Sequence, residues 1–592
     1  MSFFSFNQDN PNNDTNYLGR VRSVDTRRLA IDAEDAHLER IGVGKLVALP
    51  VPGPMDDWLI GIVERIARQS VTPDAVLVID NEDPENVANS ADIQGDLIQG
   101  NTVAVTLVGT VRKTSVTSDN SNTHDFSRSL IHLPDIHREC YVLRQLALES
   151  FMGLLVRAGD TDSALEIGSY TLDRRAKAYL DGDRFFQRHA ALLGSTGSGK
   201  SWTVATILEQ ASTLPSANLI VFDLHGEYRD LSYAEQLRIP GPDDLGENSD
   251  GTLYLPYWLM NAEELIAMFI DSTEFTAHNQ TLAFQEAVVR EKTRRLESEG
   301  QTEVLNSFTV DSPVPFDLIA VIDEIRRLNE EMVQGQRGLK KGNFNGQFSR
   351  LLARIGTKLN DRRYGFLFQA PDSWHTYDAF HALVTQLLDF AGDKKGIKVI
   401  DFSEVPADVL PVMLGIVARM IHYLQFWTPD DIRHPVALVC DEAHLYLPRD
   451  KGNPNQQRAV ANFEKIAKEG RKYGVSLLIV SQRPSDVSTT ILSQCNNVMA
   501  LRLTNSDDQN VVKRLMPETM SSFIEMLPIL DIGEALVVGD AVLLPSRIKV
   551  QEPTEKPLSA TINVWTEWSK PDLESNWVLS AENMRRQRRR SS

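Results

Sequence analysis

A glycine-rich stretch, GSTGSGKS at residues 194–201, follows the apolar run HAALL and precedes the helix-compatible run SWTVATILEQ. Glycines at both ends of the loop let the backbone curl and aim its N–H groups at phosphate oxygens. Lys200 would then reach the β- and γ-phosphates of a nucleotide, while the hydroxyl of Ser201 would bind Mg²⁺. The glycine order G-x-x-G-x-G differs from the G-x-G-x-x-G turn of dinucleotide-binding domains. The residues expected to contact the nucleotide are Gly194, Ser195, Thr196, Gly197, Ser198, Gly199, Lys200, Ser201 and Trp202.

An ATPase of this kind also needs carboxylates for the metal's hydration shell and for the attacking water. The segment VALVCDEAH at 436–444 supplies two of them at the end of an apolar run. Asp441 is expected to hold Mg²⁺ through water, together with Ser201, and Glu442 to activate the attacking water. A solvated acidic turn would have the same sequence, but the glycine-rich loop favours a catalytic pair. The tandem favours hydrolysis over transfer to a small acceptor and predicts ATP and Mg²⁺ as cofactors.

The segment FDLHGEY at 222–228 ends another apolar run at the carboxyl edge of the expected sheet, where open α/β folds bind ligands. Its polar residues are Asp223, His225 and Glu227. Such residues can simply cap a turn. We expect instead that Glu227 or His225 faces the nucleotide.

The segment KEGRKYGVSLLIVSQRPSDVS at 468–488 offers two more candidates. Gln482, at a strand end beside the expected γ-phosphate, would sense hydrolysis, although an ordinary strand-end amide would look the same. Arg471 lies just before that strand. Its planar guanidinium suits the charge that develops on a neighbouring subunit's γ-phosphate. The alternative is a surface arginine at a helix end, where cations suit the dipole.

The elements that must position these residues begin after a β-rich N-terminal region. From 17 to 113, short apolar runs such as KLVALPV and WLIGIVERIA alternate with Gly, Pro, Asp and Asn. This pattern is typical of small all-β domains and predicts an N-terminal β-barrel. We expect a flexible lead-in over 1–16 and a linker over 114–160.

The rest of the chain predicts an α/β core that is divided in two. Residues 161–255 have the pattern of a βαβ unit, and 396–550 alternate strand-like runs with long helices. Such alternation predicts a parallel sheet with helices on both faces. Residues 256–395, with helical periodicity throughout, are expected to be a helical insertion within the core. Residues 551–592 form a C-terminal extension that ends in an arginine-rich tail.

The chain has 592 residues, enough for three or four domains, and a formal net charge of −20. The whole surface therefore cannot attract a polyanion, so any contact with nucleic acid must use a local basic surface. The cluster RRQRRR at 585–590 is either a disordered tail or a contact for DNA or a partner. The stretch RDKGNPNQQR at 449–458 is either a pore loop or a disordered surface loop.

The composition also bears on location. The three cysteines lie far apart without a CxxC pair, which signals neither a disulfide framework nor a zinc site. The N-terminus lacks a basic region followed by a long apolar stretch, so no secretory signal is expected. The most apolar segment, 405–427, carries Asp408, Arg419 and His422 and is a poor membrane span. We expect a cytoplasmic protein that contacts no membrane.

Together these motifs resemble the HerA family of hexameric DNA translocases, within the group that includes FtsK-type motors. The resemblance rests on RHAALLGSTGSGKS, VFDLHGEY, LVCDEAHLYLP, GRKYG and VSQRPSDVSTTILSQCNN. It extends to the order of a barrel, a core with a helical insertion and a C-terminal brace. Leu224 stands where the family pattern has Pro before the His, which leaves the acid and the His in place.

The resemblance implies a homo-hexameric ring of RecA-like cores, with ATP between subunits and double-stranded DNA threading the central pore. It implies that Arg471, and also Arg188 ahead of the glycine-rich loop, reach the site from the neighbouring subunit. It further implies a partner nuclease or NAD-hydrolysing effector that docks on the N-terminal barrel. The setting would be DNA-end processing or bacterial antiphage defence.

Two other functions stay open. The ring could be a scaffold that recruits and activates a partner effector enzyme, with ATP use regulating assembly; the acidic composition and sparse basic patches keep this open. It could also be an ATPase that translocates polypeptide. The lack of a membrane span argues against an anchored FtsK-type pump or a conjugative coupling protein. The lack of an LSGGQ motif argues against ABC ATPases.

Overall fold

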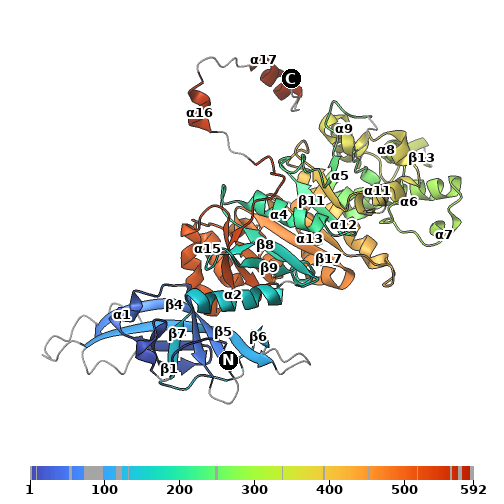
Figure 1. Cartoon of the computed structure of the whole chain (residues 1–592). Helices are drawn as coiled ribbons and strands as arrows, with labels where there is room; N and C mark the ends of the chain where they lie inside the picture. The colour runs from blue at the N-terminus through green and yellow to red at the C-terminus, as the bar shows by residue number, and fades with distance from the viewer. Residues whose placement is uncertain are drawn as a thin grey trace, which may run out of the picture. The chain divides into compact units, whose positions relative to one another are not determined.

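The computed structural model divides into two compact units, Met1–Phe185 with Asn497–Gln551 and Phe186–Asn496 with Glu552–Ser592 (Figure 1). The residues that the structure describes are 3–8, 10–51, 56–71, 98–114, 123–130, 132–159, 161–246, 251–335, 338–390, 392, 394–450, 452, 454–516, 518–559, 563–570 and 577–586.

The first unit contains a closed antiparallel β-barrel (Figure 1). Its strands are β1 (Tyr17–Asp25), β2 (Arg28–Ala33), β3 (Leu46–Pro50), β4 (Trp58–Val71), β5 (Ile98–Thr114) and β7 (Glu139–Val142). They pair in the order β2-β1-β7-β3-β4-β5, and the pairing of β5 with β2 closes the ring. The barrel core is apolar, as the alternating pattern predicts. It includes Leu18, Val21, Leu29, Ile31, Val47, Leu49, Leu59, Val63, Val103, Val105, Leu107 and Val142.

The barrel extends past the expected boundary at residue 113. The strand β7 lies between β1 and β3 and completes the ring, although it comes from the segment expected to be a linker. The same segment contains β6 (Thr123–Ser127), which pairs with β5, and α2 (Gln145–Gly159). A four-residue strand such as β7 carries too little periodicity to be recognised in the sequence. Residues 115–122 lie outside the described residues.

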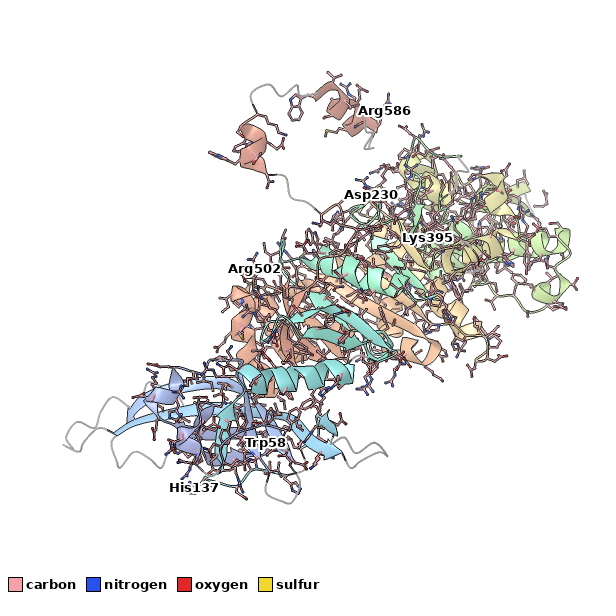
Figure 2. All side chains as sticks on the ribbon, viewed as in Figure 1. Trp58, His137, Asp230, Lys395, Arg502 and Arg586 are labelled. Atoms are coloured by element: carbon pink, nitrogen blue, oxygen red, sulfur yellow. The ribbon has the colours of Figure 1, made fainter. Side chains whose placement is uncertain are left out.

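The segment expected to be a flexible lead-in packs on the barrel instead. Phe4 is 1% exposed, and its ring meets the edge of Trp58 with the centroids 5.2 Å apart (Figure 2 labels Trp58). Phe6 stacks on Tyr141 with ring centroids 4.6 Å apart. Aromatic rings bury large areas, so these contacts tie the terminal segment down.

The first unit also contains an antiparallel sheet with the order β18-β19-β20-β8-β9. The strands are β8 (Ala164–Tyr170), β9 (Lys177–Asp181), β18 (Asn497–Ala500), β19 (Glu534–Gly539) and β20 (Ser546–Val550). The helices α15 (Ser506–Leu515) and η10 (Glu518–Ile529) lie between β18 and β19 in sequence, and α3 (Gly182–Gln187) follows β9. The segments expected to open and close the core thus contribute to the first unit.

The second unit contains the parallel sheet that the sequence predicts. Its strands run in the order β12-β15-β11-β16-β17-β10, and the five neighbouring pairs are all parallel. The bounds are β10 (Ala190–Leu193), β11 (Leu219–Asp223), β12 (Glu235–Arg238), β15 (Ile397–Asp401), β16 (Val436–Cys440) and β17 (Val475–Ser481). Every residue of β11, β16 and β17 is buried, as expected of strands covered on both faces. Because the strands are parallel, their carboxyl ends meet at one edge.

Three long helices belong to this core: α4 (Lys200–Ser212), α12 (Leu410–Trp427) and α13 (Pro454–Glu469). The helix α12 is long and apolar enough to cross a membrane, but 67% of that window is buried within the protein. It packs against α13, where a Cβ on Gly415 would lie 3.0 Å from the Cα of Ala459. The close approach explains the glycine, and α12 is a core helix.

The insertion is helical, as expected. Its helices are α5 (Ala262–Phe269), α6 (Ala277–Ser298), α7 (Thr302–Leu305), α8 (Leu318–Glu330), α9 (Ser349–Asn360), α10 (Gly365–Phe368) and α11 (Ala379–Leu388). It also contains a hairpin that the sequence did not predict, formed by β13 (Met332–Gly335) and β14 (Gly338–Lys341).

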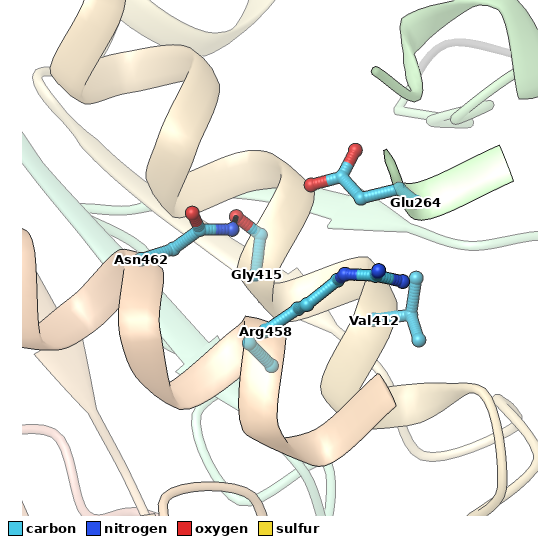
Figure 3. A pocket seen from close by; sticks show the side chains of 6 residues that line it. Glu264, Val412, Gly415, Arg458 and Asn462 are labelled. Carbon is cyan, nitrogen blue, oxygen red and sulfur yellow. Dashed lines mark hydrogen bonds between the residues drawn. The ribbon is translucent and has the colours of Figure 1, made fainter. Parts of the chain in front are cut away.

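A buried ion pair anchors the insertion to the core. Arg419 of α12 donates to both carboxylate oxygens of Glu264, at the start of α5, over 2.9 and 2.8 Å. Glu264 lines a small pocket between α5, α12 and α13 (Figure 3). In the same pocket Asn462 donates to the carbonyl of Gly415 over 3.2 Å. The Arg419–Glu264 pair therefore fixes α5 where the insertion begins.

The C-terminal extension contains two short helices, α16 (Val564–Trp568) and α17 (Trp577–Arg586). The arginine-rich tail begins at the end of α17, where Figure 2 labels Arg586. Residues 587–590 of that tail lie outside the described residues. So do residues 451 and 453 of the stretch at 449–458, whose later part opens α13.

Candidate active site

The glycine-rich loop connects the end of β10 to the first turn of α4. Gly197 and Gly199 have φ angles of 71° and 105°, in the left-handed region that favours glycine. The N–H of Gly194 donates to the carbonyl of Ser481 over 3.2 Å and ties the loop to the end of β17. A Cβ on Gly197 would meet no atom within 4 Å, so the loop borders open space. A glycine loop at the N-terminus of a thirteen-residue helix is suited to bind an anion.

Lys200 and Ser198 show that this loop fits a phosphate group. Lys200 is buried, and its Nζ has a long contact of 3.4 Å with the carbonyl of Ser195. Burial lowers the pKa of Lys200, while three nearby carboxylates, led by Glu442, act to raise it. The Ser198 hydroxyl is buried without a hydrogen-bond partner among the described residues. Phosphate oxygens would satisfy both side chains.

The acid pair lies at the end of β16, where the sequence places it. Asp441 is 4% exposed, and burial raises its pKa well above the usual range, with further contributions from Glu442 and Glu227. Glu442 has a left-handed φ of 45° and donates its N–H to Oδ1 of Asp441 over 2.9 Å. Strained backbone of this kind is found at functional sites.

The acid pair fits Mg²⁺ that is shared with a nucleotide. The described residues contain no group of three or more His, Cys, Asp or Glu side chains arranged to hold a metal alone. Mg²⁺ commonly takes one or two protein ligands and completes its shell with phosphate oxygens and water. Asp441 and Ser201 would supply the protein ligands. The cation would also relieve the repulsion among the buried carboxylates.

Gln482 joins the loop to Glu442. Its Nε2 donates to Oε1 of Glu442, and its Oε1 accepts a hydrogen bond from the hydroxyl of Thr196. On the other side, Nδ1 of His444 lies 3.3 Å from Oε2 of Glu442. Burial lowers the pKa of His444. Gln482 thus orients Glu442, whereas Oε2 of Glu442 has no hydrogen-bond partner among the described residues. The sequence named Gln482 and missed His444, although His444 follows in the same DEAH segment.

The turn at 222–228 has a structural acid at its centre. Asp223 accepts hydrogen bonds from the backbone N–H groups of His225, Gly226, Glu227 and Tyr228, over 2.8–3.2 Å. His225 is exposed. Glu227 is half-buried and lies close enough to Lys200 to affect its pKa. Of the two expected residues, Glu227 lies near Lys200, and a nucleotide contact of either residue stays a prediction.

A segment that the sequence did not suggest also reaches the site. Residues 552–558, here called the C-terminal strap, run beside α4 and the turn at 222–228. The N–H of Leu558 donates to the carbonyl of Glu227 over 2.7 Å, and the N–H of Thr554 donates to Glu209 over 2.8 Å. Nζ of Lys556 lies 4.8 Å from the ring centroid of Trp202. These contacts join distant segments, so no local pattern predicts them.

The two arginines expected to act in trans lie outside this cluster. Arg471 is exposed on η8 (Gly470–Tyr473), and its guanidinium has no ion-pair partner within the described part of the chain. Arg188 is half-buried just before β10, and its carbonyl accepts from the N–H of Asn496 over 3.1 Å. Their action on a neighbouring subunit stays a prediction.

Residues 165–421 match the family described as the central domain of helicase HerA. The chain therefore carries a HerA-type central domain. It is 25% identical over 416 residues to a probable helicase of Methanocaldococcus jannaschii, covering 69% of this chain and 70% of that protein. It is 26% identical over 447 residues to the DNA double-strand break repair helicase HerA of Sulfolobus acidocaldarius, covering 72% and 76%.

The chain is also similar, at lower sequence identity, to two solved structures. VirB4 of Thermoanaerobacter pseudethanolicus is 16% identical, with a TM-score of 0.43, over 66% of this chain and 97% of that one. The bacterial conjugative coupling protein TrwB, without its first 70 residues, is 13% identical, with a TM-score of 0.43, over 69% and 93%.

The core has the fold of a RecA-like P-loop ATPase. The loop strand β10 lies next to β17, which Gln482 follows directly, and β17 lies next to β16, which Asp441 follows directly. This order places the phosphate loop, the polar strand-end residue and the acid pair at one edge. ATP and Mg²⁺ are the cofactors that these residues fit, and the predicted α/β class with its barrel and helical insertion is confirmed.

Proposed function

We propose that this HerA-type ATPase is a double-stranded DNA translocase or helicase that works as a homo-hexamer. The observation that carries the proposal is a pair of hydrogen bonds that links the side chains of Thr196, Gln482 and Glu442 beside Lys200. These residues belong to the segment that matches the HerA central domain or follow it in the same sheet. This geometry joins the phosphate loop to the acid suited to activate water. The curated relative from Sulfolobus acidocaldarius, named a DNA double-strand break repair helicase, supports DNA as the substrate.

Each residue has a defined part in hydrolysis. The loop N–H groups and Lys200 hold the β- and γ-phosphates, and Ser201 with Asp441 would hold Mg²⁺, which supplies positive charge against the developing negative charge. Glu442 accepts the proton of the attacking water. Gln482 orients Glu442, and its hydrogen bond with Thr196 couples the position of Glu442 to the conformation of the phosphate loop. Trp202 and Glu227 complete the nucleotide's surroundings at the strap side.

The homo-hexamer is proposed because an exposed arginine of one subunit suits the phosphate site of the next. Arg471 is exposed and carries a planar guanidinium. An arginine that reaches a neighbour's γ-phosphate would couple hydrolysis to movement between subunits. We assign this part to Arg471 first and to Arg188 second, in a ring whose pore admits duplex DNA.

The barrel is proposed to dock the partner. It has a closed apolar core, which suits a docking module. The partner would be a nuclease or an NAD-hydrolysing effector in the cytoplasm, and the process DNA-end processing or antiphage defence. The acidic chain supports the second function, a ring scaffold that activates this effector and uses ATP to regulate assembly.

Displacement of a third strand from linear duplex DNA tests the proposal. The wild-type protein with ATP and Mg²⁺ should displace a bound triplex-forming strand, and Glu442→Gln should bind ATP without displacement. Glu303→Gln, at an exposed acid of α7, is the matched control and should behave as wild type. Displacement by Glu442→Gln would contradict the site assignment. Full effector activation by Glu442→Gln, with no displacement by wild type, would establish the scaffold.

A further inference from the structure

Positive charge is concentrated in one part of the insertion. Residues 332–360 contain six Lys or Arg and no Asp or Glu, in a chain whose formal net charge is −20. The six are Arg337, Lys340, Lys341, Arg350, Arg354 and Lys358. The segment covers the β13–β14 hairpin and α9. It is therefore a local basic region of the kind that an acidic protein needs in order to contact a polyanion.

The hairpin exposes both of its faces. In its antiparallel register Met332 pairs with Lys341 and Val333 with Lys340. All four residues of β14 are exposed, and Leu339 retains 69% of its surface. Because neighbouring side chains of a strand point to opposite faces, exposure of all four means that neither face of β14 is covered. The hairpin is a two-stranded ribbon at the margin of the insertion, where Figure 1 labels β13.

The root of the ribbon is fixed. The N–H of Gly342 donates to the carbonyl of Glu331 over 2.9 Å. Asn329, at the end of α8, accepts the N–H of Gly346 at its carbonyl and the N–H of Phe348 at its side chain, over 2.9 and 2.8 Å. The ribbon is thus held on α8 and α9 rather than being a loose loop.

Three of the cations are available to a ligand. Lys340 and Lys341 are exposed, and neither has an ion-pair partner among the residues that the structure describes. The side chain of Arg350 is 82% exposed and lies 3.8 Å from Glu274. Arg354, in contrast, is held 3.0 Å from the same carboxylate and is 31% exposed. Glu274 therefore neutralises Arg354 and leaves Arg350 projecting.

We propose that the β13–β14 ribbon, together with Arg350, binds the phosphate backbone of double-stranded DNA at a site separate from the ATPase centre. A two-stranded ribbon fits the major groove, and Lys and Arg gain affinity by releasing the counterions of the phosphates. The ribbon carries no acid that would repel the backbone. This inference rests on the proposed function, because it takes duplex DNA as the substrate.

The test is the salt dependence of duplex binding by the full chain without ATP. Lys340→Ala/Lys341→Ala should bind a fluorescent linear duplex several-fold more weakly at 50 mM salt. The slope of log affinity against log salt should fall by about 1 to 2, since each lost phosphate contact removes ~0.9. ATP hydrolysis in the absence of DNA should be unchanged, because neither lysine touches the nucleotide site.

The matched control is Lys394→Ala/Lys395→Ala. It removes two charges from the same Lys-Lys-Gly sequence, but there Lys394 pairs with Asp389 over 3.0 Å (Figure 2 labels Lys395). The control should keep the wild-type slope. An equal loss in both variants would mean a general charge effect and would overturn the inference.

Two further outcomes separate the ribbon from the proposed function. If the wild type binds duplex and the ribbon variant has the same slope, the ribbon assignment fails while the translocase stands. In that case, weakened binding of polyglutamate by the variant would assign the ribbon to an acidic protein surface. If the wild type binds no duplex at all, both the proposed function and the ribbon assignment fail.

Discussion

The side-chain amide of Gln482 donates a hydrogen bond to the carboxylate of Glu442, although 40 residues separate the two in sequence. The same amide accepts a hydrogen bond from Thr196, 286 residues away. These contacts exist because β17 is a parallel neighbour of both β10 and β16. Leu193 is paired to Ser481 and Cys440 to Ile479, so the three strands end side by side. The orientation of the acid suited to activate water is thereby linked to the phosphate loop.

Gln482→Ala should lower kcat for ATP hydrolysis by 10- to 100-fold and change KM little. The reason is that Glu442 loses a partner that orients it, whereas the loop and Lys200 that hold the phosphates stay intact. Steady-state kinetics across ATP concentrations would measure the effects on kcat and on KM separately. The control is Gln494→Ala, at an exposed amide. A rise in KM at constant kcat would instead assign Gln482 to binding.

Thr196→Val should reduce kcat by less than Gln482→Ala, and the two changes together should cost no more than Gln482→Ala alone. The valine keeps the shape of threonine but removes the hydroxyl that Gln482 accepts from. Because the two residues act on Glu442 in series, their effects should not add. A double-mutant cycle on kcat would measure this, and full additivity would show that Thr196 acts independently.

Because of His189, the free energy of unfolding should decrease as the pH is lowered. Its Nδ1 accepts from the N–H of Leu477 and its Nε2 donates to the carbonyl of Ala467, over 3.0 and 3.1 Å. Burial lowers the pKa of His189 to about 4, from 6.5. As the pH falls, His189 is therefore protonated in the unfolded chain before it is protonated in the folded protein. The contribution of neutral His189 to the free energy of unfolding is complete above pH 6.5 and is lost as the pH falls toward 4.

The measurement compares urea unfolding of wild type and His189→Gln at pH 7.5 and pH 5. Between these pH values the free energy of unfolding of the wild type should fall by ~2 kcal/mol because of His189. This figure corresponds to about 1.4 kcal/mol for each pH unit below 6.5. Other groups titrate equally in both proteins, so the difference isolates this histidine. Equal losses in the two proteins would mean that His189 is protonated in the folded core.

Arg419→Met should destabilise the protein by about 3–5 kcal/mol, because it leaves the buried Glu264 without its partner. Glu264→Gln in the same chain should recover part of the loss. The glutamine carbonyl can still accept the N–H of Asn261, which now donates to Glu264 over 2.9 Å. Thermal unfolding of the single and double variants checks this. No recovery in the double variant would show that Arg419 acts mainly through its bond to the carbonyl of Leu259.

The phosphate loop and the acid pair could be predicted because each is a short contiguous segment whose chemistry depends on residue type and spacing. Their meeting could be predicted because parallel strands bring their carboxyl ends to one edge. Gln482 was predicted to lie near the phosphates, but its bond to Thr196 depends on the register of β10 and β17. No single segment contains that register.

Other parts could not be read from local patterns. The strand β7 is four residues long and takes its place only from its neighbours β1 and β3. The β13–β14 hairpin is embedded in helical periodicity. The strap contacts of Leu558 and Lys556 join the C-terminal extension to residues more than 300 positions earlier in the chain. Phe4 and Phe6 order a segment whose polar composition suggests a flexible end.

Steady-state ATP hydrolysis with and without linear duplex DNA tests the central claim most directly. The purified chain should hydrolyse ATP faster when duplex is present, and Lys200→Ala should abolish both rates, because no other buried cation is placed in the phosphate loop. Hydrolysis that depends on Lys200 but is indifferent to DNA would contradict the translocase. It would favour the scaffold, with the partner effector as the missing stimulus.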